Sequence, residues 1–180
     1  MSLLCGSVLV PDLFRGRPWI KDSPMNMYED WAATHPLERI VKDIDTAANW
    51  LVEEIAAAGV NMKVGLVGFS LGGGVIFEVL ARDDGRRFMT AACFYPMNFN
   101  STIATKIHVP LLVVCGDNDD KCSPDMVESI STQMRNVKTL LYSGRGHGFA
   151  HRPKSLEEDG DAENAFLAMK SWLHEKLVAV

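Results

Sequence analysis

Short apolar runs alternate with amphipathic stretches along most of this chain of 180 residues. The runs lack the regular polar alternation of a half-exposed strand, so each is expected to form a strand that is covered on both faces. They lie at Ser7–Leu13, Lys63–Phe69, Met89–Tyr95, Pro110–Cys115 and Val137–Tyr142. Buried strands that alternate with helices are typical of an α/β fold, with a mostly parallel sheet flanked by helices.

The stretches between these runs have the three- and four-residue periodicity of helices. Helices are predicted at Pro36–Gly59, Leu71–Arg82, Pro124–Met134 and, roughly, Asp161–Val178. Residues 20–35, which follow Trp19 and contain Trp31 among polar residues, are expected to form a long loop, either an irregular surface loop or one on the substrate side. Because no linker or repeat interrupts the pattern, a single domain is expected over residues 1–180.

The composition argues against several classes of function. The net charge of −5, without a cluster of lysine and arginine, gives no electrostatic footprint for nucleic acid. No apolar stretch approaches the roughly eighteen residues of a membrane span, and Met1–Val10 lacks the basic region and cleavage site of a signal peptide. The cysteines occur singly, which favours reduced, buried thiols and a cytoplasmic location. They are Cys5, Cys93, Cys115 and Cys122.

The sequence Gly68-Phe69-Ser70-Leu71-Gly72 is a G-x-S-x-G motif between a predicted strand and a predicted helix. In that setting the motif indicates a nucleophile elbow, with Ser70 as the nucleophile. Glycines at both flanks would leave room where a side chain would collide with the strand or the helix. The start of the helix favours negative charge, so the Leu71 N–H is the expected oxyanion donor. A glycine-rich turn without a catalytic role is the alternative, and the dinucleotide and Walker phosphate motifs are not matched.

A serine nucleophile needs a base, and the base needs an acid that holds it in the right tautomer. His147, between two glycines after the last predicted strand, is the predicted base. Asp119 is the predicted acid because its G-x-x-D spacing from Gly116 fits, and Asp120 is the alternative. Both loops follow the carboxyl ends of strands, where ligand crevices form in open α/β sheets.

The loop that carries Asp117, Asp119 and Asp120, called the acid loop below, also suggests a calcium-binding loop that starts at Asp117. That loop requires glycine at its sixth position, where this chain has Cys122. We therefore expect no metal site there.

Three segments, taken together, resemble the dienelactone hydrolase family. Val10-Pro11-Asp12-Leu13-Phe14-Arg15-Gly16 resembles its V-P-D-x-F-x-G segment, Gly68–Gly73 its G-F-[CS]-x-G-G elbow, and Gly146–Phe149 its histidine loop. The resemblance implies an α/β-hydrolase fold and a cytoplasmic enzyme, without a cofactor, that cleaves a small-molecule carboxylic ester or lactone. Several members of the family have cysteine as nucleophile, whereas serine here implies serine-esterase chemistry with a catalytic triad of Ser70, Asp119 and His147.

The same resemblance draws attention to three arginines near the predicted strand ends. Arg15, Arg17 and Arg152 are candidates for a bidentate pair with a substrate carboxylate. The alternative is that all three are surface residues without a role in substrate binding.

The family has further strands before its V-P-D segment, together with the loop that gives the second oxyanion N–H. The resemblance therefore implies a partial, N-terminally shortened fold, with one strand absent between Ser7–Leu13 and the elbow strand. Loss of one oxyanion donor lowers the rate by about 10²- to 10³-fold. The alternative function is a catalytically weak or inactive hydrolase remnant that acts as an interaction module, a homodimer through an exposed sheet edge.

Overall fold

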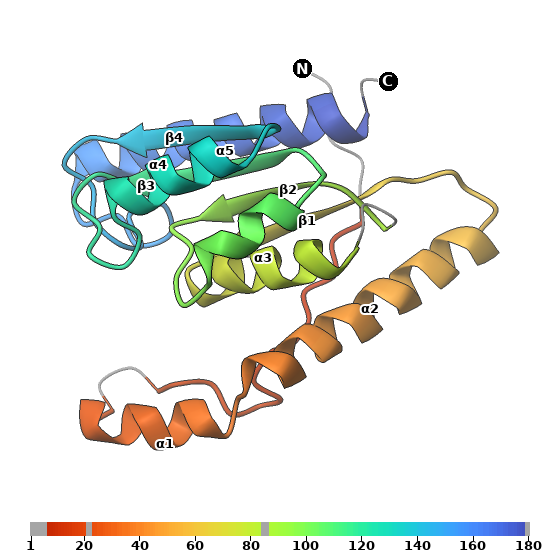
Figure 1. Cartoon of the computed structure of the whole chain (residues 1–180), viewed down its shortest axis with the longest axis horizontal. Coiled ribbons are helices and arrows are strands. Elements are labelled where there is room, and N and C mark those ends of the chain that lie inside the picture. The colour runs from red at the N-terminus through yellow and green to blue at the C-terminus, as the bar shows by residue number, and fades with distance from the viewer. Residues whose placement is uncertain (1–6, 21–22, 84–86, 179–180) are drawn as a thin grey trace. The chain divides into compact units, whose positions relative to one another are not determined.

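The computed structural model describes residues 7–20, 23–83 and 87–178. The chain divides into two compact units, an N-terminal unit that ends at Asn61 and a sheet unit that begins at Met62. Figure 1 labels the α-helices and strands of both units. The single domain expected from the sequence stays a prediction. None of the helices in the described ranges combines the length and the hydrophobicity that a membrane span requires.

Four parallel strands form the sheet, in the order β1-β2-β3-β4. They are β1 (Val64–Phe69), β2 (Phe88–Phe94), β3 (Leu111–Gly116) and β4 (Val137–Tyr142). Each agrees with a predicted strand to within one residue at either end. β3 is buried along its whole length and β2 everywhere except at Met89, as expected of strands between two helical layers. The predicted α/β class is thus confirmed.

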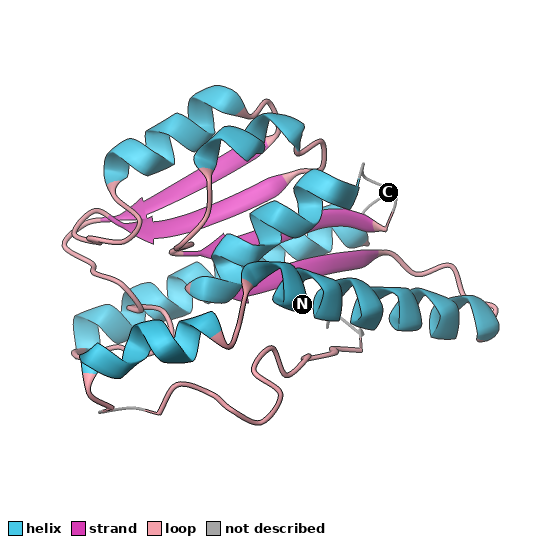
Figure 2. Cartoon of the chain, turned by 60° about the horizontal axis from the view of Figure 1, so that its bottom comes forward, coloured by secondary structure: helices cyan, strands magenta, loops and turns pink. Residues whose placement is uncertain are grey.

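Helices cover both faces of this sheet (Figure 2). On one face, α5 (Leu156–Leu177) packs on a core that contains Phe94, Leu112 and Val114. Side chains alternate along a strand, so Cys93 and Val113 point to the opposite face. That second layer contains α3 (Leu71–Asp83), the short 3-10 helix η2 (Ser101–Lys106) and α4 (Pro124–Gln133).

The helices α3 and α4 match their predicted ranges to within one residue, but α5 begins five residues before the predicted start. Ser155 caps α5, because its hydroxyl accepts the Glu158 N–H at 3.1 Å. Ser155 and Glu158 have the Ser-x-x-Glu spacing of a capping box, which is the sequence signal for this earlier start.

The N-terminal unit contains η1 (Met25–Met27), α1 (Tyr28–Ala33) and α2 (Leu37–Ala57). The helix predicted before Gly59 is α2. The prediction of a long loop at residues 20–35 is wrong for residues 25–33, which form η1 and α1. Packing supports the short α1, since isolated helices of this length are marginal in water. The Trp31 ring of α1 lies 5.3–5.6 Å, between centroids, from the rings of Phe14, Trp19 and Tyr28.

The predicted strand at Ser7–Leu13 is wrong. Residues 7–12 have no regular secondary structure, and Val8 and Val10 are 87% and 82% exposed. A strand exists only where a neighbouring strand pairs with its backbone N–H and C=O groups. The described residues supply no such neighbour to this segment, so its apolar pattern alone does not produce a strand.

The segment that resembles V-P-D-x-F-x-G instead ends in a turn at residues 13–16. The Asp12 carboxylate accepts the Phe14 N–H at 3.0 Å and the Gly16 N–H at 2.6 Å. These backbone hydrogen bonds lower the pKa of Asp12. Arg15 and Gly16 adopt φ values of 51° and 75°, so the turn uses the left-handed conformation that glycine tolerates best. The aspartate and glycine of this motif therefore have a structural role in the turn.

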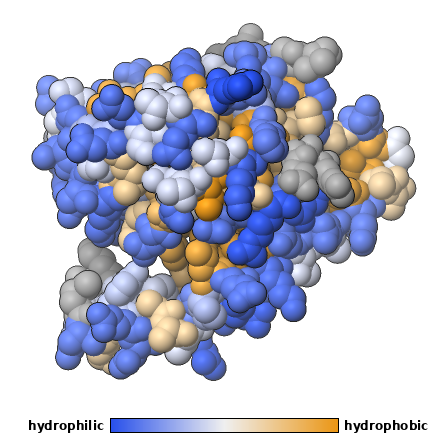
Figure 3. Space-filling model, viewed as in Figure 1, coloured by the Kyte–Doolittle hydropathy of each residue, from blue (hydrophilic) through white to orange (hydrophobic). Residues whose placement is uncertain are grey.

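The strand β1 lies at an edge of the sheet and, among the described residues, pairs with β2 alone. Its side chains Val67 and Phe69 are 42% and 40% exposed. Most of the surface presented in Figure 3 is hydrophilic, with smaller hydrophobic areas between the polar ones. β1 therefore leaves apolar side chains and backbone polar groups open beside the turn at its carboxyl end.

Candidate active site

Ser70 lies on the sharp turn between β1 and α3, in the position of a nucleophile elbow. Its φ is 54°, in the left-handed region that costs energy for a residue other than glycine. Three backbone hydrogen bonds hold the turn. The Ser70 N–H donates to the Phe94 carbonyl at 2.9 Å, and the Ser70 carbonyl accepts the N–H groups of Gly74 at 3.1 Å and Met97 at 3.2 Å. The start of α3 and the segment after β2 thus fix the elbow.

The two glycines of the G-x-S-x-G motif differ in their surroundings. A Cβ added to Gly68 would lie 2.5 Å from the Gly72 carbonyl oxygen, so a larger residue does not fit there. A Cβ added to Gly72 would meet nothing within 4 Å among the described residues. The expectation that both glycines relieve a collision is therefore right for Gly68 and wrong for Gly72.

Ser70, His147 and Asp119 form one chain of hydrogen bonds at the carboxyl ends of β1, β4 and β3. The Ser70 Oγ lies 2.8 Å from His147 Nε2, and His147 Nδ1 lies 3.0 Å from Asp119 Oδ2. The Asp119 side chain is fully buried. A proton on Nδ1, donated to the carboxylate, leaves Nε2 free to accept the Ser70 hydroxyl hydrogen. The structure thus brings the three residues of the predicted triad together.

Asp119, rather than its neighbour Asp120, faces the histidine. Asp119 Oδ1 also accepts the backbone N–H groups of Lys121 at 2.8 Å and Cys122 at 3.1 Å, which fixes the orientation of the carboxylate. Asp120 is exposed. Of the two alternatives left open by the sequence, the geometry favours Asp119.

Backbone contacts join the acid loop after β3 to the histidine loop after β4. The Asn118 N–H donates to the Arg145 carbonyl at 3.0 Å. The Asp117 Oδ1 accepts the Gly144 N–H at 2.6 Å. A Cβ added to Gly116 would lie only 1.9 Å from the Arg145 carbonyl oxygen, so the two loops touch directly at this glycine. The distance between His147 and Asp119 therefore depends on loop–loop contacts as well as on the sheet.

Two cysteines lie behind the acid loop. Cys115 Sγ and Cys122 Sγ are 3.0 Å apart, and both thiols are free and buried, as is that of Cys93. The hydrogen bond to Cys122 and burial raise the pKa of the Cys115 thiol. A buried, protonated thiol behaves as a small apolar side chain, which is the packing role expected from the sequence. Cys5 lies outside the described residues.

A second histidine, His151, lies close to His147 but is not predicted from the sequence as a site residue. The Tyr95 hydroxyl forms a hydrogen bond with His151 Nδ1. The ring of Tyr95, a fully buried residue, packs edge-on to the His147 ring with centroids 5.1 Å apart. Burial raises the pKa of the Tyr95 phenol, so the hydroxyl stays protonated and can donate. The only available sequence signal for His151 is its position four residues after His147 in the same loop.

The surroundings of His151 lead us to expect that the protein becomes less stable to unfolding at mildly acidic pH. Partial burial, and then the charges of Arg152 and His147, lower the pKa of His151 in the folded state. The unfolded state therefore binds a proton more readily, and the free energy of unfolding should fall as pH drops through about 6.5. We expect chemical denaturation at pH 7.5 and pH 5.5 to show this fall.

The His151→Gln variant should have a smaller fall in unfolding free energy between these two pH values than the native chain. The matched control is His108→Gln, because His108 is also exposed but precedes β3, at the opposite end of the sheet from His151. A pH dependence that is unchanged in His151→Gln but reduced in His108→Gln would contradict the assignment to His151.

Of the three candidate arginines, Arg152 shares the sheet unit with Ser70. Its side chain is exposed, its backbone N–H donates to Gly148 at 3.0 Å, and its charge lowers the pKa of His151. Arg152 therefore lies within electrostatic reach of the cluster formed by Tyr95 and His151.

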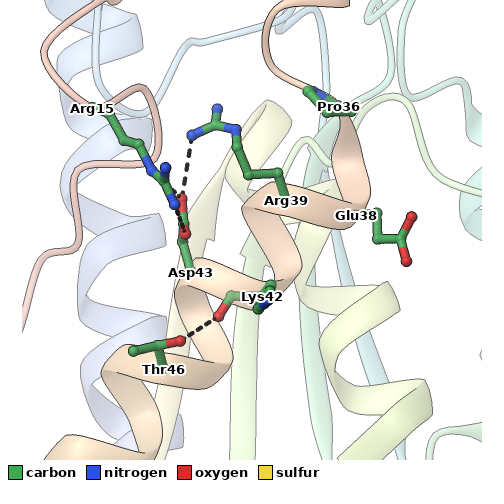
Figure 4. A pocket seen from close by; sticks show the side chains of 7 residues that line it. All are labelled: Arg15, Pro36, Glu38, Arg39, Lys42, Asp43 and Thr46. Carbon is green, nitrogen blue, oxygen red and sulfur yellow. Dashed lines mark hydrogen bonds and ion pairs between the residues drawn. The ribbon is translucent and has the colours of Figure 1, made fainter.

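Arg15 and Arg17 belong to the N-terminal unit. Arg15 donates two hydrogen bonds to Asp43, at 2.6 Å and 3.1 Å, so its guanidinium already has a carboxylate partner. Figure 4 shows this pair in an open groove of the N-terminal unit, with Arg39 also directed at Asp43. Arg17 is exposed, and its carbonyl accepts the indole N–H of Trp31 at 2.9 Å. A role for these two arginines in substrate binding stays a prediction.

Comparison with known proteins identifies relatives over nearly the whole chain. Residues 7–177 match the model of the dienelactone hydrolase family. Carboxymethylenebutenolidase homologues of Mus musculus and Rattus norvegicus are 23% and 24% identical in alignments 178 residues long that cover 94% of this chain and 70% of each relative.

Solved structures with the same fold include three that are 16–19% identical to this chain. A Klebsiella pneumoniae protein gives a TM-score of 0.66 over 83% of this chain and 67% of its own. Est1E of Butyrivibrio proteoclasticus gives 0.60 over 79% and 71%. A dienelactone hydrolase-like promiscuous phosphotriesterase from metagenomic libraries gives 0.60 over 85% and 65%. The shared fold is that of the α/β-hydrolases.

Proposed function

The chain belongs to the dienelactone hydrolase family, and we propose that it cleaves a small carboxylic ester or lactone with Ser70 as nucleophile, His147 as base and Asp119 as acid. The observation that carries this proposal is the continuous hydrogen-bond chain from Ser70 Oγ, through both ring nitrogens of His147, to the Asp119 carboxylate. The proposed reaction needs no cofactor. The free, buried thiols of the described cysteines fit a reducing compartment, and we place the protein in the cytoplasm.

In the first half of the reaction, Ser70 Oγ attacks the acyl carbon while His147 Nε2 takes the hydroxyl proton. Asp119 keeps its hydrogen bond to Nδ1–H and stabilises the imidazolium cation. The carbonyl oxygen becomes an oxyanion, which accepts the Leu71 N–H. Leu71 is the first residue of α3, where helix N–H groups have no partner within the helix.

In the second half, the tetrahedral intermediate expels the alcohol oxygen, which takes the proton from His147 Nε2. Ser70 is then acylated. Water attacks the acyl carbon, gives a proton to His147, and releases the carboxylic acid as Ser70 recovers its hydrogen. For a lactone, the alcohol and the acid are two ends of one product. We expect Arg152 to attract substrates that carry a carboxylate, because its charge reaches the neighbourhood of the site.

A fluorophosphonate probe tests this proposal without knowledge of the substrate, because it labels only a serine activated by its surroundings. The native chain should be labelled, and Ser70→Ala should lose the label. Ser171→Ala is the matched control, since Ser171 is exposed on α5 and should leave labelling unchanged. The proposal fails if the folded native chain is not labelled or if the Ser70→Ala variant still is.

A second candidate function is an interaction module with little or no hydrolase activity, which forms a homodimer through β1. The open edge of β1, with Val67 and Phe69 exposed, favours this candidate. Light scattering coupled to size exclusion separates the two candidates when it is combined with probe labelling. A labelled monomer supports the hydrolase, and an unlabelled dimer supports the interaction module.

A further inference from the structure

The thioether of Met97 lies against the proposed nucleophile. Met97 Sδ is 3.1 Å from Ser70 Oγ, and the same oxygen is 2.8 Å from His147 Nε2. A thioether sulfur is only a weak acceptor, so the imidazole remains the better acceptor of the hydroxyl hydrogen. The main effect of Met97 is therefore to occupy space beside the oxygen that would attack the substrate.

The backbone that carries Met97 is fixed to the elbow and to α3. The Met97 N–H donates to the Ser70 carbonyl at 3.2 Å. A Cβ added to Gly74 would lie 1.9 Å from the Met97 carbonyl oxygen, so the segment after β2 lies directly on the helix. Tyr95, two residues before Met97, and Asn98, directly after it, have φ values of 37° and 56° that shape the segment. The backbone at Met97 is thus held in place, whereas its side chain can still rotate.

The geometry of the tetrahedral intermediate indicates which part of a substrate would meet this side chain. The reacting carbon carries the Ser70 oxygen, the oxyanion, the leaving group and the acyl chain. In the proposed mechanism the oxyanion lies at the Leu71 N–H, and the leaving group must reach His147 Nε2 to take its proton. The acyl chain is the one substituent of that carbon without another assigned partner, and Met97, whose sulfur lies 3.1 Å from Ser70 Oγ, is the side chain placed to border it.

We propose that Met97 determines acyl specificity, and that it restricts the site to esters of short acyl chains and to small lactones. The inference rests on the proposed hydrolase function. Methionine has three rotatable side-chain bonds and adapts to irregular spaces, so an acetyl or butyryl group can be accommodated. A long chain needs more room than side-chain rotation provides, because the backbone of residue 97 is held on both sides.

The test compares p-nitrophenyl acetate, butyrate and octanoate as substrates of the native chain and of Met97→Ala and Met97→Leu. The native chain should prefer acetate and butyrate. In Met97→Ala, the ratio of kcat/KM for octanoate to that for acetate should rise by about 10- to 100-fold, as for other changes of a few carbon atoms in an apolar pocket. Met97→Leu is close in volume and should keep the native ratio within a few-fold.

Fluorophosphonate labelling of each variant separates failure of this inference from failure of the proposed function. A labelled Met97→Ala variant with the native ratio would overturn the role of Met97 and leave the hydrolase proposal intact. An unlabelled native chain would overturn the hydrolase proposal itself. If Met97→Ala does not fold, Met97→Phe tests the same space from the opposite direction. Its added bulk should reduce kcat/KM for butyrate more than for acetate, and equal losses would overturn the inference.

Discussion

Replacement of Asp119 by asparagine is expected to lower kcat/KM for p-nitrophenyl acetate by about 10³- to 10⁴-fold while the fold is retained. Asp119 Oδ1 accepts the backbone N–H groups of Lys121 and Cys122. In the variant, the amide oxygen should take that place because only an oxygen can accept them. The amide N–H₂ then faces His147 Nδ1 and favours the tautomer with its proton on Nε2. That tautomer cannot accept the Ser70 proton.

Asp120→Asn is the matched control for this prediction. Asp120 is adjacent in sequence, carries the same charge and is exposed, so its replacement should change kcat/KM by less than about twofold, as is usual for surface substitutions. Circular dichroism of both variants checks that the fold is retained. A larger loss of activity in Asp120→Asn than in Asp119→Asn would assign the acid to Asp120.

The parts of the fold that are predictable from the sequence are those in which local pattern and final pairing agree. β1 to β4 are short apolar runs bounded by turns, and their neighbours in the sheet are neighbours in sequence order. Ser7–Leu13 has the same kind of apolar pattern, but among the described residues no strand pairs with it. A strand depends on its partner, and an apolar run does not reveal whether the partner is present.

In the candidate site too, residues marked by a local pattern are predictable from the sequence, and those placed by contacts between segments are not. Ser70 and His147 lie in glycine-flanked loops that are recognisable locally, at the ends of predicted strands. The choice between Asp119 and Asp120 depends on which carboxylate the turn directs at the histidine. Because the two aspartates are adjacent and identical in type, the sequence does not show which of them points there. Met97 is not predicted because its contact with Ser70 joins loops that are 27 residues apart in sequence.

Replacement of Gly116 by alanine is expected to separate the acid loop from the histidine loop. The new Cβ would lie 1.9 Å from the Arg145 carbonyl oxygen and 2.4 Å from its carbonyl carbon, which are backbone atoms that cannot rotate away. The Arg145 carbonyl also accepts the Asn118 N–H, so its displacement breaks a hydrogen bond between the loops. We expect the free energy of unfolding to fall by about 3 kcal/mol. A shift of about 1 Å between His147 and Asp119 would lower kcat/KM by about 100-fold.

Urea denaturation and ester hydrolysis measure the two effects, with Gly160→Ala as the matched control. Gly160 lies in α5, and a Cβ there would meet nothing within 4 Å among the described residues. Alanine at this helical position should raise the free energy of unfolding by about 0.5–1 kcal/mol and leave kcat/KM unchanged. A Gly116→Ala variant with native stability and activity would mean that the loops can move apart without disturbing the hydrogen bond between His147 and Asp119. The contact at Gly116 would then have no part in holding the base to the acid.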